Sequence, residues 1–294
     1  MNTSSCDATT PLHAENIQTI NDDNIPDNKI PADILQKIIG ELMMKYKKDG
    51  VLLNLEVDKK LTPINSCVGG VPYFPKGMEY PMADGQPLIL LCQINYSEMP
   101  KLANFPTEGL LQFFIGTGNY YGTEHSKLIY HKTVSLELNQ SVPQSITDVL
   151  KNALKEDLPF KGAFRLTGKI GETFALPEDR DTLFEKLAMK YSVNSWDIED
   201  DVCKATDSLT TIKSQYGGCP NFIDENVYED DRNTKEVLLL QLASEEYKRD
   251  EPRYYKNEWS KVNYCQYGSG FFFINGEKLK KLEFDDVTYT YDCD

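Results

Sequence analysis

A double-glycine loop motif occurs twice in this chain and constrains its fold more than any other feature. It reads GGVPYF at residues 69–74 and GGCPNF at 217–222, an offset of 217 − 69 = 148. An apolar segment ending near a glutamine follows each copy at the same offset, LLCQI at 90–94 and LLLQL at 238–242. Self-similarity at a fixed offset indicates repeated supersecondary units. We therefore predict that the chain contains an internal duplication.

A third element closes each repeat unit. It reads GLLQFFI at 109–115 and GSGFFFI at 268–274, where the offset of 268 − 109 = 159 reveals an insertion in the second unit. Short apolar runs bounded by turns are typical of buried strands. Neither unit can bury its apolar face alone, whereas two copies packed around a pseudo-twofold axis bury both. The predicted fold class is α+β: a β-rich single domain of two related, mainly antiparallel β halves with a few peripheral helices.

The predicted domain organisation follows from composition and periodicity. Residues 1–28 are polar and poor in aromatic side chains, so we expect a disordered leader. One domain spans 29–294, with repeat halves at about 51–140 and 205–284. A connection of helices and a β-ribbon, 141–204, joins the halves.

Individual elements are expected from hydrophobic periodicity and turn residues. The expected helices run from Pro31 to Asp49-Gly50, over 141–154 and over 177–191. The expected strands are 51–57, 87–94, 109–116 and 127–138, with a β-ribbon at 159–176 that bends at Gly162, Gly168 and Gly171.

The repeated motif admits a structural and a functional interpretation. Glycine supplies positive φ or lets another backbone approach closely, and the following proline fixes a turn. Because the motif occurs in both halves, we favour a structural corner over a ligand contact. Gln93 and Gln241 are ambiguous in the same way, since each amide either braces the loop above it or points into a cleft. A buried amide needs hydrogen-bond partners, and we favour bracing.

The net charge of the chain limits the classes of partner that it can bind. The net charge is 31 − 46 = −15 and the sequence pI is about 4.7. Such a surface repels the phosphate backbone of nucleic acids and anionic membranes. It is complementary to a basic protein. No apolar run approaches the ~18 residues of a membrane helix. We therefore predict no nucleic-acid partner and no membrane association. The acidity either keeps the chain soluble, which we favour, or attracts a basic protein as a partner.

Cysteine usage bears on the compartment. The chain has seven cysteines, and no two form a C-x-x-C pair, so zinc-ribbon and thioredoxin-like folds lack support. Scattered single thiols favour a reducing compartment. The N-terminal residues lack the apolar core of a signal peptide. We therefore predict a cytoplasmic location.

The order of the motifs resembles the YwqG-like family, a bacterial-type domain of unknown function. The resemblance rests on GGVPYFPKGMEYP at 69–81, LILLCQIN at 88–95 and GLLQFFIG at 109–116, and it extends over about residues 50–284. It implies a compact β-rich α+β domain with two related halves and no established catalytic activity. It also implies immunity or partner-binding roles, because some relatives lie near bacterial toxin genes. Ala243 departs from the pattern, where an acidic residue is common.

The chain offers few groups for catalysis. His13 lies in the leader, and His125 and His131 are six residues apart around an expected strand, where Cys92 or Cys265 is a conceivable nucleophile. No P-loop, dinucleotide-binding glycine motif or zinc-protease motif is present in the sequence. The acidic clusters do not match an EF-hand loop. We therefore lean against an enzyme and predict no cofactor and no metal.

Three classes of function remain open. The favoured one is a non-enzymatic protein-interaction module, of the immunity or inhibitor type, that binds a basic partner. Its predicted acidic surface consists of Asp197, Glu199, Asp200, Asp201, Glu225, Glu229, Asp230 and Asp231. The alternative is a small-ligand-binding module with a cleft between the halves. Its predicted ligand- or partner-binding residues are Tyr73, Phe74, Gln93, Tyr120, Tyr121 and Gln241. The third is an enzyme built on His125 or His131.

Overall fold

The computed structural model describes residues 30–117, 121, 123–135, 140–153, 158–177, 179–223 and 237–293. The helices are α1 (Ala32–Tyr46), η2, a 3-10 turn (Tyr96–Glu98), α2 (Gln144–Ala153), α3 (Arg180–Tyr191), α4 (Ser195–Thr210) and α5 (Gly276–Lys281). The strands are β1 (Lys47–Val57), β2 (Cys67–Val68), β3 (Met82–Ala83), β4 (Gln86–Pro87), β5 (Ile89–Asn95), β6 (Leu110–Ile115), β7 (Ser126–His131), β8 (Phe164–Phe174), β9 (Gln215–Gly217), β10 (Val237–Ala243), β11 (Glu245–Glu246), β12 (Ser260–Val262), β13 (Ser269–Ile274) and β14 (Val287–Asp292). The predicted leader, 1–28, lies outside the described residues.

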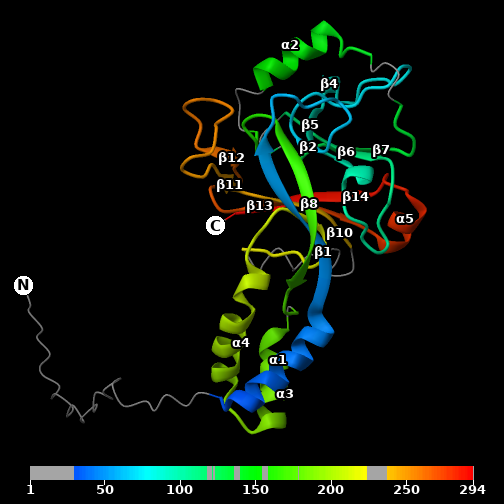
Figure 1. Cartoon of the computed structure of the whole chain (residues 1–294). Helices are drawn as coiled ribbons and strands as arrows, with labels where there is room; N and C mark the ends of the chain where they lie inside the picture. Colours follow the sequence, from blue (N-terminus) through cyan, green and yellow to red (C-terminus); the bar gives the residue numbers. More distant parts are fainter. Residues whose placement is uncertain are drawn as a thin grey trace, which may run out of the picture.

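One large antiparallel sheet dominates the molecule (Figure 1). Its strand order is β14-β13-β10-β9-β1-β8-β2-β5-β6-β7. The long strands β1 and β8 pair over their whole length at its centre. We call β2, β5, β6 and β7 the first half of the sheet, and β9, β10, β13 and β14 the second half. The prediction of a β-rich, mainly antiparallel fold is confirmed.

The two halves continue the sheet on opposite sides of the central pair. Strand β9 pairs with β1, and β2 pairs with β8. Each half then runs outward through an apolar strand that carries a glutamine, an aromatic strand and an edge strand. The strands β5 and β6 lie within two residues of their predicted positions, because turns bound both apolar runs.

The β-ribbon predicted at 159–176 is a single strand, and two of its expected bends are wrong. Gly168 and Gly171 lie inside β8. A Cβ atom at Gly168 would meet Val51 at 2.6 Å, and one at Gly171 would meet Leu52 at 2.5 Å. The missing side chains therefore make room for the neighbouring strand. Gly162 lies before the strand with a φ of 145°, as a bend requires.

The sheet curls so that its halves face each other and it nearly closes. The rings of Phe113 on β6 and Phe272 on β13 lie 5.0 Å apart, although these strands are far apart in the sheet order. The edge strands also approach, since Tyr130 on β7 contacts Phe284 just before β14 at 5.3 Å. One hydrophobic core therefore includes side chains of both halves.

Three helices, α1, α3 and α4, pack together at one end of the β1–β8 pair (Figure 1), and we call them the helical trio. Their shared core consists of Ile30, Ile38, Leu42, Phe174, Phe184, Leu187, Ile198 and Val202. The first helix ends at Tyr46, three residues earlier than expected from Asp49-Gly50, because β1 already begins at Lys47. No helix among the described residues has the length and hydrophobicity to cross a membrane.

One pair of cysteines departs from the predicted pattern of single thiols. Cys265 and Cys293 form a disulfide, with their Cα atoms 5.5 Å apart. Among the described residues, Cys67, Cys92, Cys203 and Cys219 are free. Disulfides persist in oxidising compartments, so the cytoplasmic location stays a prediction.

Candidate functional site: a cleft between the halves

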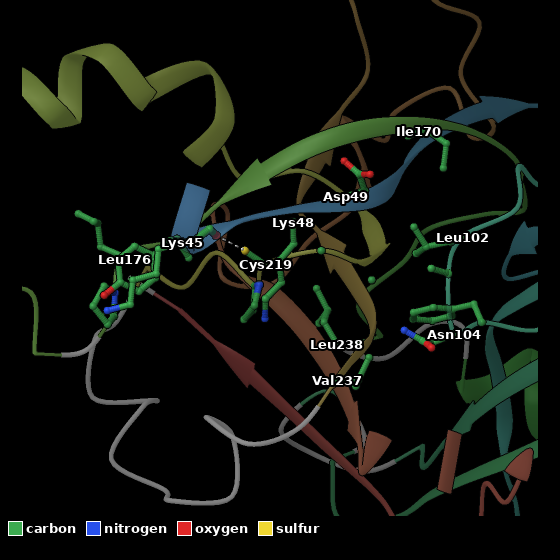
Figure 2. Close-up of a pocket in the computed structure, with 18 of the residues that line it drawn as sticks. Lys45, Lys48, Asp49, Leu102, Asn104, Ile170, Leu176, Cys219, Val237 and Leu238 are labelled. Atoms are coloured by element: carbon green, nitrogen blue, oxygen red, sulfur yellow. Dashed lines mark hydrogen bonds between the residues drawn. The ribbon is translucent and has the colours of Figure 1, made fainter. Parts of the chain in front are cut away.

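A cleft of about 1180 Å³ opens between the two halves, beside the helical trio (Figure 2). Further pockets of about 530, 330 and 210 Å³ are smaller. The cleft is lined by five short segments and by Ile170. The segments are 45–49 without Lys47, 101–105, 175–179 without residue 178, 217–220 and 237–238. Ligand sites are commonly clefts of about 300–1,000 Å³, so this one is large enough for a small molecule.

One wall is the loop 101–105 of the first half, which rests on the second half. The side chain of Leu102 packs on Gly217, where a Cβ atom would stand 2.3 Å from it. The ring of Phe105 lies 5.3 Å from that of Tyr216. The hydroxyl of Tyr216 donates a hydrogen bond to the carbonyl of Pro100 (3.2 Å). These contacts hold the wall in place.

The adjoining wall is the second double-glycine loop, which hydrogen bonds to the central strands. The Cys219 amide donates to Thr173 Oγ1 (2.8 Å), and that hydroxyl donates to the Lys48 carbonyl (2.9 Å). The Cys219 thiol donates to the Tyr46 carbonyl (3.3 Å). Burial raises the pKa of Cys219, which keeps the thiol protonated and unreactive. Cys219 therefore anchors the loop.

The double glycines are structural corners, as predicted. Gly69, Gly70, Gly217 and Gly218 all have positive φ. In the first copy, a Cβ atom at Gly69 would stand 2.3 Å from the carbonyl oxygen of Gly162. Both reasons for glycine, backbone conformation and close approach, therefore apply in each half.

Three ammonium groups line the cleft, from Lys45, Lys48 and Lys101. Within the part of the chain that the structure describes, none of them has a carboxylate within 4.0 Å. Among the described residues, the acidic side chains of the lining are Asp49 and Asp179. The cleft therefore has a local excess of positive charge in a chain whose net charge is −15.

Apolar side chains form much of the remaining lining. Leu102 lies on one side of the cleft, Leu176 on the other, and Val237 and Leu238 lie along the floor between them (Figure 2). A lining that combines apolar side chains with a few charged groups is typical of small-molecule sites.

Three of the predicted binding residues lie at the first double-glycine loop instead of lining this cleft: Tyr73 and Phe74 are part of the loop, and Gln93 braces it. The buried Gln93 accepts a hydrogen bond from the Tyr73 amide (3.2 Å) and donates to the carbonyls of Pro63 and Asn65 (2.7 Å each). Tyr73 and Phe74 are buried as well. Gln93 thus has the bonds that the bracing interpretation requires, and a ligand role for these residues stays a prediction.

The other predicted binding residues lie elsewhere. Tyr121 contacts the rings of Tyr264 and Tyr291, and its hydroxyl accepts a hydrogen bond from the Cys265 amide (3.0 Å). Gln241 is buried and accepts from the Asn221 amide (3.1 Å). Tyr120 lies outside the described residues. None of the predicted binding residues that the structure describes lines the 1180 Å³ cleft.

Half of the predicted acidic surface is described, and it lies on α4. Asp197, Glu199, Asp200 and Asp201 are half-buried or exposed there, and Asp200 pairs with Lys204 one turn later. Trp196 beside them is 77% exposed. Glu225, Glu229, Asp230 and Asp231 lie outside the described residues.

The two histidines that the structure describes do not come together with a nucleophile. His125 precedes β7 and pairs with Asp84 (3.2 Å), whereas His131 ends β7 and hydrogen bonds to Gln112 (2.9 Å). Burial lowers the pKa of His131 and favours its neutral form. Cys92 is fully buried, and Cys265 is in the disulfide. Among the described residues, no cluster of three His, Cys, Asp or Glu side chains is arranged to hold a metal ion.

Apart from the double glycine, no sequence pattern pointed to the residues that line the cleft. The lysines carry no motif, and the segments that they belong to are far apart in the sequence. One signal was available: positively charged residues concentrated around the start of β1, in an acidic chain.

Comparison with known families supplies a classification. Residues 66–293 match the model of a family described as a domain of unknown function, DUF1963. No curated protein matches the chain.

Proposed function

We infer that this chain, which belongs to the DUF1963 family of domains of unknown function, is a small-ligand-binding module. One observation carries the proposal: a cleft of about 1180 Å³ whose two walls come from different halves of the sheet. Buried hydrogen bonds and close packing hold both walls, so a ligand would bind a largely preformed site. A site between two halves is also where small ligands are commonly found.

Filling the cleft tests the proposal. Ala103 is an exposed lining residue, so Ala103→Trp should occupy the cleft without disturbing the core. Ala205→Trp, at an exposed position of α4, is the matched control. In a thermal-shift screen with a metabolite panel, we expect a ligand at 100 Kd to raise the Tm of the wild type and the control by about 5 °C or more. Ala103→Trp should abolish that shift. A shift that survives Ala103→Trp would place binding elsewhere and overturn the proposal.

A second function, binding of a basic protein of the immunity or inhibitor type, is favoured by one observation on α4. Trp196 is 77% exposed and stands beside Glu199 and Asp200. Exposed tryptophan is enriched at the centre of protein interfaces, and a rim of carboxylates attracts a basic partner.

The test is retention of a partner from native lysate at rising salt. For the double variant Trp196→Ala/Asp200→Asn we expect at least tenfold less retained partner than for the wild type. Glu56→Gln, an exposed carboxylate on β1, should behave as wild type. If the amount of retained partner changes neither with salt nor in the double variant, this function is contradicted, because salt screens exposed charges.

We further propose that the two halves arose by duplication, and the matching hydrogen bonds support it. The hydrogen bond from the Tyr73 backbone amide to the Gln93 side chain recurs 148 residues later as the bond from the Asn221 backbone amide to the Gln241 side chain. The Leu166 amide donates a hydrogen bond to the Ser66 carbonyl (2.9 Å), and the Leu53 amide donates one to the Ser214 carbonyl (2.8 Å). The two acceptors are related by the same offset, since 66 + 148 = 214. An experimental structure in which 66–115 fails to superpose on 214–274 would contradict the duplication.

Two narrower assignments belong to the same proposal. The YwqG-like classification rests on the order of the three motifs in each half, and a determined structure of a YwqG-like protein with another strand order would contradict it. A cytoplasmic location rests on the four free cysteines among the described residues. Cell fractionation tests that location, and recovery outside the cytoplasm would refute it.

A further inference from the structure

We propose that the cleft takes an amphipathic anion: an apolar body with one carboxylate or phosphate group, held by Lys48 with Lys101 and Lys45 beside it. This inference rests on the proposed ligand-binding function and adds the chemical class of the ligand. It follows from how the charged and apolar side chains are distributed over the lining.

Lys48 is the cation that faces the interior of the cleft. Neighbouring side chains in a strand point to opposite faces. Lys48 is paired with Thr173 across the β1–β8 pair, and the Thr173 hydroxyl holds the Cys219 amide, so Lys48 shares the face of the second glycine loop. Asp49 leaves the strand on the other side (Figure 2). Asp49 also lines the cleft, but from the other face of the strand, and the ion pairs of the described residues include none between it and Lys48.

Among the described lining residues, the remaining charges leave an excess of positive charge. Lys45 lies at the end of α1, with its ammonium over the Tyr46 ring at 4.8 Å. Tyr46 is the main cause that raises the pKa of Lys45, and the Asp179 carboxylate adds a smaller electrostatic contribution. Lys101 stands on the opposite wall, at the start of the loop 101–105. Lys48 and Lys101 thus line the cleft from two different segments, β1 and the loop 101–105.

The apolar part of the ligand has its own surface. Leu102 on one wall and Leu238 on the floor offer side chains that bury an alkyl or aromatic body (Figure 2), and Phe105 belongs to the same loop as Leu102. Burying apolar area contributes roughly 25 cal/mol per Å². A hydrophilic anion would leave these side chains in water, and a neutral apolar molecule would leave the ammonium groups without a partner. An amphipathic anion satisfies both.

Calorimetric titration of the full-length protein with four probes of equal chain length tests the class. The probes are octanoate, octyl phosphate, octanol and octyltrimethylammonium. We expect the wild type to bind octanoate or octyl phosphate at least tenfold more tightly than octanol, and octyltrimethylammonium more weakly still. The tighter of the two anions identifies the head group, carboxylate or phosphate.

Substitutions assign the effect to Lys48. Lys48→Met keeps the length of the side chain but removes its charge, so anion affinity should fall about tenfold while octanol affinity is unchanged. Lys59→Met, at an exposed position just beyond the end of β1, should leave both unchanged. A structural defect would weaken all four probes together, which separates misfolding from lost charge recognition.

The outcomes separate this inference from the function on which it rests. Equal affinities for octanoate and octanol, both lost in Ala103→Trp, would overturn the anion class and leave the cleft as a ligand site. Binding of every probe that persists in Ala103→Trp would overturn the cleft itself. No binding of any probe at millimolar concentration would overturn the ligand class.

Discussion

A fragment that begins at residue 66, where the family match begins, is expected not to fold. The match covers 66–293, yet β1 (Lys47–Val57) lies at the centre of the sheet. Deleting β1 exposes one long side of β8 and leaves β9 paired with β10 alone. It also removes the buried side chains of Val51, Leu53 and Leu55. At about 1.5–3 kcal/mol each, these side chains alone contribute roughly 5–9 kcal/mol, which is comparable to the whole stability of a domain.

The measurement is circular dichroism during urea titration of two fragments, 66–294 and 30–294. The longer fragment retains every contact described here from Ile30 onward and should unfold in one cooperative transition. The shorter one should show no transition. A cooperative transition of 66–294 at the same urea midpoint would show that β1 is dispensable, contrary to its place in the sheet.

The second large effect is expected for Gly69→Ala. Gly69 has a φ of 65°, and a Cβ atom there would stand 2.3 Å from the Gly162 carbonyl oxygen and 2.8 Å from the Phe160 ring. Positive φ costs a residue with a Cβ about 1–2 kcal/mol, and overpacking adds about 1–3 kcal/mol. We therefore expect Gly69→Ala to lower the free energy of unfolding by about 2–5 kcal/mol.

Gly77→Ala separates the two contributions. Gly77 has a φ of 86°, and a Cβ atom added there would meet nothing within 4 Å. Its substitution should cost only the backbone contribution of about 1–2 kcal/mol. Urea denaturation of both variants measures the difference. Equal losses would mean that the loop yields to the added methyl group and that close approach does not explain Gly69.

Much of the sheet was predictable because its signals are local. The strands β5 and β6 are apolar runs bounded by turns, and the repeated motif marks where each half begins. The glycines of β8 misled the sequence analysis, since a glycine inside a strand looks like a bend until the neighbour that fills its space is known. For Gly168 that neighbour is Val51, more than a hundred residues earlier.

Helix α4 and the cleft were missed for different physical reasons. The buried side of α4 consists of Ile198, Val202 and Thr206. So few apolar side chains give a weak helical period in a segment rich in acidic residues. The cleft has no local signal at all. Lys48 lines the cleft because Thr173, its partner across the two strands, hydrogen bonds to Cys219 of the second glycine loop and holds that loop on the same face of the sheet. Such a site depends on pairing between distant segments, which periodicity and motifs do not report.

The pairing of β1 with β8 has a consequence for synthesis of the chain. Lys47 pairs with Phe174, a separation of 174 − 47 = 127 residues. At about 5–20 residues per second, a ribosome needs roughly 6–25 s to make that stretch, and during this time the apolar residues of β1 have no partner strand. Pairings this distant also fold slowly, because a long loop must close first. The nascent chain is therefore expected to depend on chaperones until β8 has emerged.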